Sequence, residues 1–165
     1  MAELTNLESK LGEVTGLAMA AKSATQKVIS LARKSDEEEL ISLLERMQSE
    51  AAETEERCTE LAGGFEGKKT KILEEARETK EKGARMLDIY LDDEADALDG
   101  FEFLTMAEAG EVGHWEVLER LASTANAAEV QELVGWALPI QQRHFEEARK
   151  TSAKLAASED PNDES

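Results

Sequence analysis

Apolar residues recur at steps of three and four along almost the whole chain, and only two prolines interrupt it. This spacing places apolar side chains on one face of an α-helix, whereas a half-buried β-strand would need strict alternation. Ala, Leu, Glu and Lys are abundant, and these residues have high helix propensity. The sequence therefore predicts an all-α protein built from long amphipathic helices.

The apolar stripes divide the chain into five predicted helices. They cover about residues 3–34, 36–62, 67–91 and 127–157, with the fourth helix starting between residues 92 and 99 and ending at 123. The first two and the last two are expected to form antiparallel hairpins, because short connections leave successive helices side by side. The middle segment is charge-dense with a thin apolar stripe of Ile72, Ala76, Met86 and Tyr90, so we expect a helical crossover on the outside. The prediction is a ferritin-like four-helix bundle, one domain over residues 1–157, with an acidic disordered tail at 158–165.

The sequence also contains residues that are typical of helix ends. Four possible N-cap residues are followed three positions later by Glu: Thr5 with Glu8, Ser35 with Glu38, Asp99 with Glu102, and Asn126 with Glu129. Each pair has the pattern of a capping box and predicts a helix start. Gly12 and Gly16 permit close approach of a neighbouring helix, and Gly63 with Gly64 is expected to end the second helix.

Net charge, the absence of a long apolar run and the single cysteine exclude several classes of function. The chain has 37 acidic and 19 basic residues, a formal net charge of -18, which disfavours binding to nucleic acid or to an anionic membrane surface. No apolar run reaches the ~18 residues of a membrane span, and the first residues do not resemble a secretion signal. Cys58 is the only cysteine and cannot form an internal disulfide. These features predict a cytoplasmic protein with a buried, inert thiol.

Polar residues interrupt the apolar stripes of the last two helices. Glu108 falls between Leu104 and Trp115 on the stripe of the fourth helix, and Glu111 and His114 follow at steps of three. A carboxylate three residues before an imidazole lies one turn away on the same side of a helix, near enough to share a metal ion.

The fifth helix carries a related pattern, Gln141 and His144, on its own apolar stripe. His114 and His144 are the only histidines in the chain, and Glu50 of the second helix is a further candidate ligand. Two readings stay open. Either Glu50, Glu108, Glu111, His114 and His144 converge on a metal, or rotation of the helices leaves Glu111 and His114 at the solvent boundary.

With these motifs in place, the layout resembles the ferritin-like superfamily, most closely the YciF-type bacterial stress-protein subgroup. The stretch Val112-Gly113-His114-Trp115-Glu116 is similar to that subgroup's Val-Glu-His-Tyr-Glu segment, and Lys68-Lys69 with the following helix resembles its crossover. The resemblance implies two iron or manganese ions between the helices, with ferroxidase- or peroxide-linked chemistry in oxidative stress.

The chain departs from the family pattern at several positions. Gln141 replaces a Glu, Gly113 replaces another, and the first helix has no carboxylate on its apolar stripe unless Glu13 rotates inward. No complete catalytic site or cofactor motif is present. The alternatives are therefore an iron or manganese protein, a single structural zinc site, or a metal-free structural or protein-interaction bundle. We also expect a homodimer, and a further protein partner stays open.

Overall fold

The computed structural model describes residues 3–164, which form five α-helices and no strand. These are α1 (Asn6–Lys34), α2 (Glu38–Ala62), α3 (Lys69–Tyr90), α4 (Ala97–Ala125) and α5 (Ala128–Ala156). The predicted all-α class is confirmed, and each expected helix is found with its ends shifted by a few residues. Residues 157–164 follow α5 without forming a further helix and are exposed.

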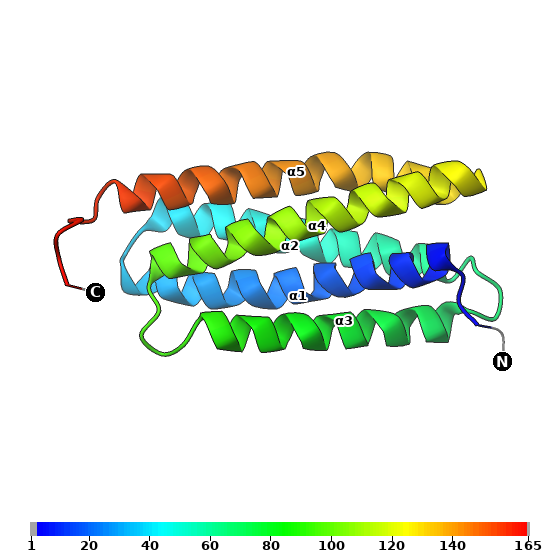
Figure 1. Cartoon of the computed structure of the whole chain (residues 1–165), viewed down its shortest axis with the longest axis horizontal. Helices are drawn as coiled ribbons and strands as arrows, with labels where there is room; N and C mark the ends of the chain where they lie inside the picture. Colours follow the sequence, from blue (N-terminus) through cyan, green and yellow to red (C-terminus); the bar gives the residue numbers. More distant parts are fainter. Residues whose placement is uncertain (1–2, 165) are drawn as a thin grey trace.

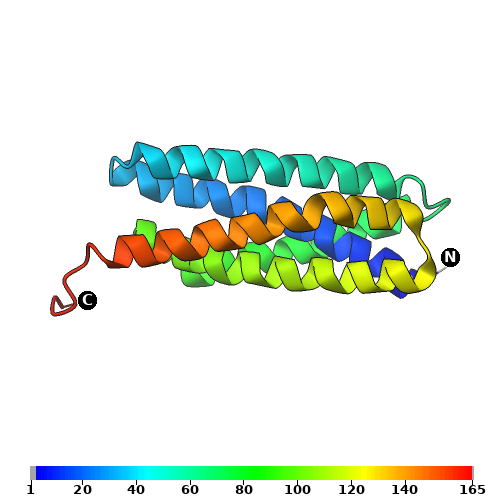
Figure 2. The same cartoon turned by 90° about the horizontal axis from the view of Figure 1, so that it is seen from above.

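The helices lie along a common axis, and each runs opposite to the helix before it (Figure 1). α1 packs against α2, α3 and α4, while α5 packs mainly against α4 and also contacts α2. α3 covers the outer side of α1, as expected for the crossover segment. Figure 2 shows α5 running between α2 and α4, on the side of the bundle away from α3.

One of the four expected N-caps is found. The Thr5 hydroxyl accepts a hydrogen bond from the Glu8 N–H (3.2 Å), and the Glu8 carboxylate accepts one from the Thr5 N–H (2.8 Å). This reciprocal pair satisfies two backbone donors that the first turn of α1 leaves open.

The other three N-cap predictions are wrong. Ser35 is instead the C-cap of α1, and its hydroxyl donates to the Leu31 carbonyl (3.3 Å). The capping box of α4 lies three residues earlier than expected, between Asp96 and Asp99. Asn126 ends α4 in the left-handed conformation (φ 51°) rather than starting α5, because Asn tolerates positive φ. Gly63 ends α2 as predicted.

The interior consists of two apolar clusters, one towards each end of the bundle. One is centred on Leu11, Trp115 and Leu118, and the other on Val28, Phe101 and Leu104. Between the clusters lies a layer that contains buried polar side chains, among them Thr54, Glu108, Glu111, Gln141 and His144. This layer contains the candidate site.

α3 lies close to α1, and its backbone comes nearest at Gly12 and Gly16 of α1. A Cβ atom added to Gly12 would lie 2.7 Å from the Ile72 carbonyl oxygen, so the two backbones are in direct contact there. Ile72 and Ala76 are the buried residues of α3. Met86 and Tyr90, expected on the same apolar stripe, are instead 44% and 57% exposed, so the second half of α3 covers the bundle less completely.

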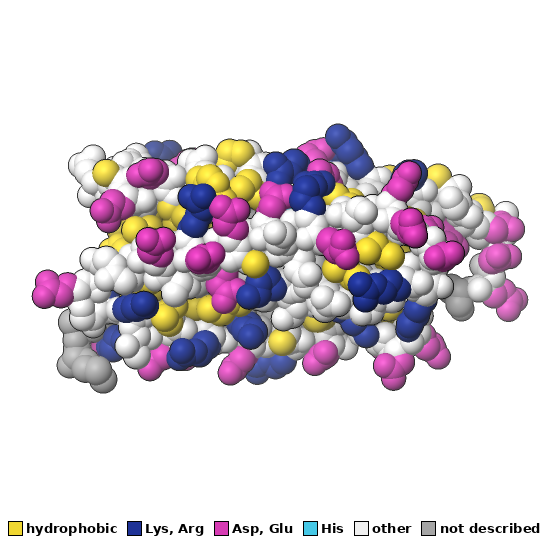
Figure 3. All heavy atoms as spheres, turned by 180° about the vertical axis from the view of Figure 1, so that it is seen from behind, with side chains coloured by type: hydrophobic (Ala, Val, Ile, Leu, Met, Phe, Trp, Pro, Cys, Tyr) yellow, Lys and Arg dark blue, Asp and Glu magenta, His cyan; other side chains and the backbone are white. Residues whose placement is uncertain are grey.

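The surface mixes both signs of charge. Figure 3 shows acidic and basic side chains interspersed over the face that carries α2, with apolar side chains visible between them. Within residues 3–164, none of the helices combines the length and the apolar composition that a membrane crossing requires.

Candidate functional site

Three helices contribute to the polar layer at the middle of the bundle. α2 supplies Glu50, α4 supplies Glu108 and Glu111, and α5 supplies Gln141 and His144. Steps of three residues on α4 and α5 keep each pair on one helix face. Gln141 and His144 lie on the buried face of α5, as their positions on the apolar stripe predicted.

His144 lies at the centre of this layer, between two carboxylates. Its side chain is 3% exposed, its Nε2 is 3.7 Å from Glu50 Oε2, and its Nδ1 is 3.7 Å from Glu108 Oε2. The two nitrogens lie on different edges of the ring, so the carboxylates approach the imidazole from different sides. Nε2 is buried without a hydrogen-bond partner in the described chain. Both separations exceed the length of a normal hydrogen bond.

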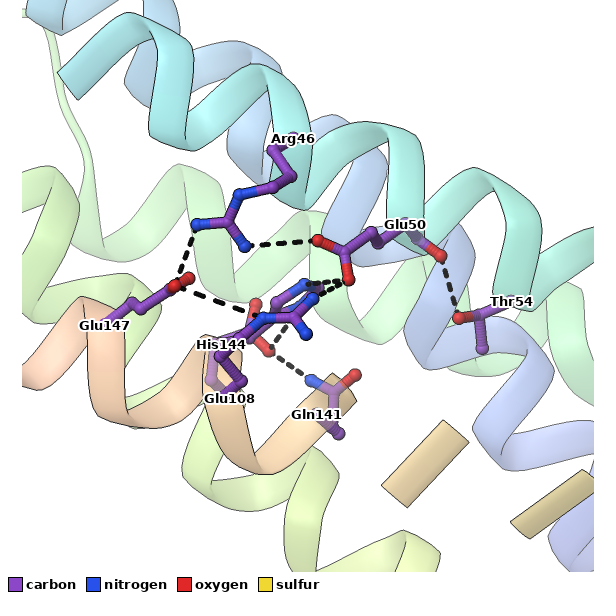
Figure 4. Close-up of polar contacts among 8 residues, drawn as sticks. Arg46, Glu50, Thr54, Glu108, Gln141, His144 and Glu147 are labelled. Atoms are coloured by element: carbon purple, nitrogen blue, oxygen red, sulfur yellow. Dashed lines mark hydrogen bonds and ion pairs between the residues drawn. The ribbon is translucent and has the colours of Figure 1, made fainter. Parts of the chain in front are cut away.

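Two guanidinium groups bind the Glu50 carboxylate. Arg143 of α5 contacts Glu50 Oε2, and Arg46 donates to Glu50 Oε1 from one turn away on α2 (3.2 Å). Arg46 also donates to Glu147 of α5 (2.8 Å), so the group joins α2 to α5 (Figure 4). The Glu50 side chain is 17% exposed, which limits screening by water. Its negative charge is therefore compensated by side chains of the protein itself.

Glu108 and Glu111 lie deeper, on α4. The Gln141 side-chain amide donates to Glu108 Oε2, and Glu108 is 1% exposed. Glu111 is 5% exposed. Burial, reinforced by the neighbouring Glu108 carboxylate, raises the pKa of Glu111 well above its usual range. Glu111 therefore carries a proton over a wider pH range than an exposed glutamate does.

His114 does not join this group. Its side chain is 42% exposed, and its Nδ1 lies 3.2 Å from Glu13 Oε2 and 3.2 Å from Lys10 Nζ, both on α1. Lys10 and Glu13 are themselves paired at 2.6 Å. The expected convergence of both imidazoles in a dry interior is therefore not found. Of the five predicted site residues, the structure gathers Glu50, Glu108, Glu111 and His144 in the central layer and leaves His114 at its edge.

The donor set does not fit a dinuclear metal centre. Within the described part of the chain, no three His, Cys, Asp or Glu side chains are arranged to hold a metal ion. A ferritin-like site needs four carboxylates and two histidines facing one point. Here one histidine lies at the edge, Gln141 offers a neutral amide, and Glu50 is already bound by Arg46 and Arg143.

The sequence patterns did not predict that Arg46, Arg143 and Glu147 belong to this site. A signal was present, because Arg46 with Glu50 and Arg143 with Glu147 both have the i, i+4 spacing of helical ion pairs. That spacing also occurs at many exposed positions, and only the packing of α2 on α5 brings these two pairs together.

Cys58 behaves as the sequence predicted. It is buried in the apolar cluster around Trp115, and burial raises the pKa of its thiol to about 12. The thiol is therefore protonated and unreactive near neutral pH.

Comparison of the chain with protein-family models, with curated proteins and with solved structures gave no match.

Proposed function

We propose that this protein is a structural or protein-interaction bundle of ferritin-like ancestry in which arginine side chains replace the metal ions at the centre. The main support is that the Glu50 carboxylate of α2 binds the guanidinium groups of both Arg46 and Arg143. The two guanidinium groups, on side chains that are 43% and 45% exposed, supply at Glu50 the positive charge that a divalent ion would otherwise supply.

The arrangement of the helices supports the ferritin-like part of the proposal. α2 and α4 run in the same direction, with α3 returning along the bundle between them in sequence (Figure 1). α1 packs against α4, and α2 contacts α5. A scaffold of this kind is compatible with loss of the original chemistry, because a fold and the site built on it change independently.

A second candidate is a single divalent ion, zinc, iron or manganese, bound by His144 and Glu50. It is favoured by the buried Nε2 of His144, which lacks a hydrogen-bond partner in the described chain and faces Glu50 Oε2 at 3.7 Å. Binding would require Arg143 to release Glu50. A role in oxidative stress, with ferroxidase- or peroxide-type activity, would require this bound ion.

The two candidates differ in how metal ions affect stability. Thermal unfolding is followed with and without Fe(II) under anaerobic conditions, Mn(II) and Zn(II). A metal-free bundle shows no rise in melting temperature, whereas any ion that binds the folded state alone raises it. His144→Ala removes the candidate ligand, and His114→Ala is the matched control because His114 lies at the edge of the bundle.

A rise in melting temperature that is kept in His114→Ala and lost in His144→Ala would overturn the metal-free proposal and establish the single-ion site. The homodimer and the cytoplasmic location stay predictions of the sequence, which sedimentation and cell fractionation test separately.

A further inference from the structure

A pocket of about 230 Å³ opens between α1, α3 and α4, next to the central layer but on the side away from Arg46 and Arg143. Six of its fourteen lining residues are alanine or glycine: Ala20, Ala21, Ala24, Gly83, Ala107 and Gly110. The pocket exists because these residues leave space where the second half of α3 covers the bundle incompletely. Met86 and Met106, 44% and 39% exposed, stand among its lining residues and are its accessible part.

Two carboxyl groups line this otherwise apolar space. Glu108 and Glu111 both border the pocket, together with His114. Glu108 already accepts a hydrogen bond from Gln141. Glu111 is 5% exposed, and none of the hydrogen bonds and ion pairs of the described chain involves its carboxyl group. A buried carboxyl group without a partner is costly, so a hydrogen-bond donor entering the pocket would relieve that cost.

We propose that this pocket binds a small organic monocation, a primary amine with a compact apolar body, whose ammonium group pairs with Glu111 as that carboxyl group releases its proton to solvent. The apolar wall supplies the contact surface, and the carboxyl groups determine the sign of the charge that is accepted. The site lies apart from the Arg46 and Arg143 network and does not depend on the proposed absence of metal.

The volume limits the size of the ligand. A cavity of roughly 150 Å³ accommodates benzene in a protein interior, so about 230 Å³ holds on the order of ten non-hydrogen atoms. An arylalkylamine such as 2-phenylethylamine has this size. An anion of the same size would meet Glu108 and Glu111 at close range and be repelled, and a neutral analogue would gain the apolar contact without the ion pair.

The test is titration of the full-length protein with benzylamine, 2-phenylethylamine and hexylamine. Two matched probes, 2-phenylethanol and 3-phenylpropanoate, keep the apolar body and change the charge. Calorimetry gives the affinity, and the NMR signals of the Met86 and Met106 methyl groups report whether the ligand enters this pocket. We expect at least one amine to bind and shift these signals, the alcohol to bind about tenfold or more weakly, and the acid not to bind.

Three variants test the roles of the Glu111 carboxyl group and of the cavity volume in amine binding. Glu111→Gln removes the carboxyl group that can ionise and pair with the ammonium group, and it is expected to weaken amine binding about tenfold or more. Ala107→Leu fills the pocket and is expected to abolish binding. Glu119→Gln, at an exposed position of α4, is expected to leave the affinity unchanged.

The proposal is overturned if none of the amines binds, if the alcohol binds as tightly as the amine, or if Glu111→Gln keeps the full affinity. It is also overturned if binding leaves the Met86 and Met106 signals unchanged. Because the probe series is measured on the unmodified protein, the result does not depend on whether the variants fold.

Discussion

Glu111 is the residue whose ionisation opposes folding most directly. Burial and the nearby Glu108 carboxylate raise the pKa of Glu111 in the folded state, while the unfolded chain keeps a value near 4.5. Between these two pKa values the folded protein holds a proton that the unfolded chain has lost. The free energy of unfolding therefore falls as pH rises through this window.

Glu111→Gln is predicted to remove this pH-dependent penalty. The amide has the shape of the protonated acid but cannot ionise, so the variant should match the parent near pH 4. Near pH 8 it should be more stable by roughly 1–3 kcal/mol. Urea unfolding at both pH values measures this, with Glu119→Gln as the exposed control. A variant that is less stable than the parent at pH 8 would contradict the account of Glu111.

Gln141 is the residue at which the chain departs most clearly from the ferritin-like motif. Gln141→Glu restores Glu-x-x-His on α5 but places a further carboxyl group against Glu108. In a metal-free centre the variant is predicted to lose roughly 1–3 kcal/mol of stability at neutral pH, because a hydrogen-bond donor becomes a second acid. Mn(II) or Fe(II) should recover part of this loss in the variant while leaving the parent protein unchanged.

The measurement is thermal unfolding with and without metal, and Gln142→Glu, on an exposed position beside it, is the control. Equal stability of the parent and Gln141→Glu without metal would show that the centre tolerates the extra charge, contrary to the proposal.

The sequence predicted part of this centre. Glu108 and Gln141 were placed inside correctly because both lie on apolar stripes, and a stripe fixes the buried face of a helix. His114 was wrongly expected inside the bundle. It directly precedes Trp115, and successive residues of a helix point about 100° apart. With Trp115 fully buried, His114 turns towards α1 and the solvent.

At the scale of helices, the apolar stripes predicted their number and approximate ends, but they did not predict which residues cap those ends. Ser35 and Asn126 are both residues that favour helix ends, but they end α1 and α4 rather than starting α2 and α5. The same polar side chains serve both kinds of end, so with connections of a few residues the pattern alone does not distinguish them.

The contact between α1 and α3 depends on the absence of a side chain at Gly12. Gly12→Ala is predicted to lower stability by roughly 1–3 kcal/mol, because its Cβ would lie 2.7 Å from the Ile72 carbonyl oxygen. Gly113→Ala is the matched control, since nothing lies within 4 Å of its added Cβ. At this exposed mid-helix position alanine should stabilise by about 0.5–1 kcal/mol. Urea unfolding measures both, and a change of the same sign in the two variants would contradict the close approach of the helices.

At the scale of the whole molecule, helix periodicity was sufficient to predict an all-α chain with the crossover segment on the outside, because that pattern is local. The centre was less predictable. The Glu50 carboxylate meets Arg143 only when α2 and α5 pack at one particular rotation and register. Two long helices can be predicted to pack together without knowledge of which pairs of polar side chains will meet.

The most direct test of a centre compensated by arginine rather than by metal is elemental analysis of the full-length protein, purified without chelators from cells supplied with iron, manganese and zinc. For a centre compensated by arginine, we expect the content of each metal to be well below one ion per chain. One or two ions per chain, kept in His114→Ala and lost in His144→Ala, would contradict it.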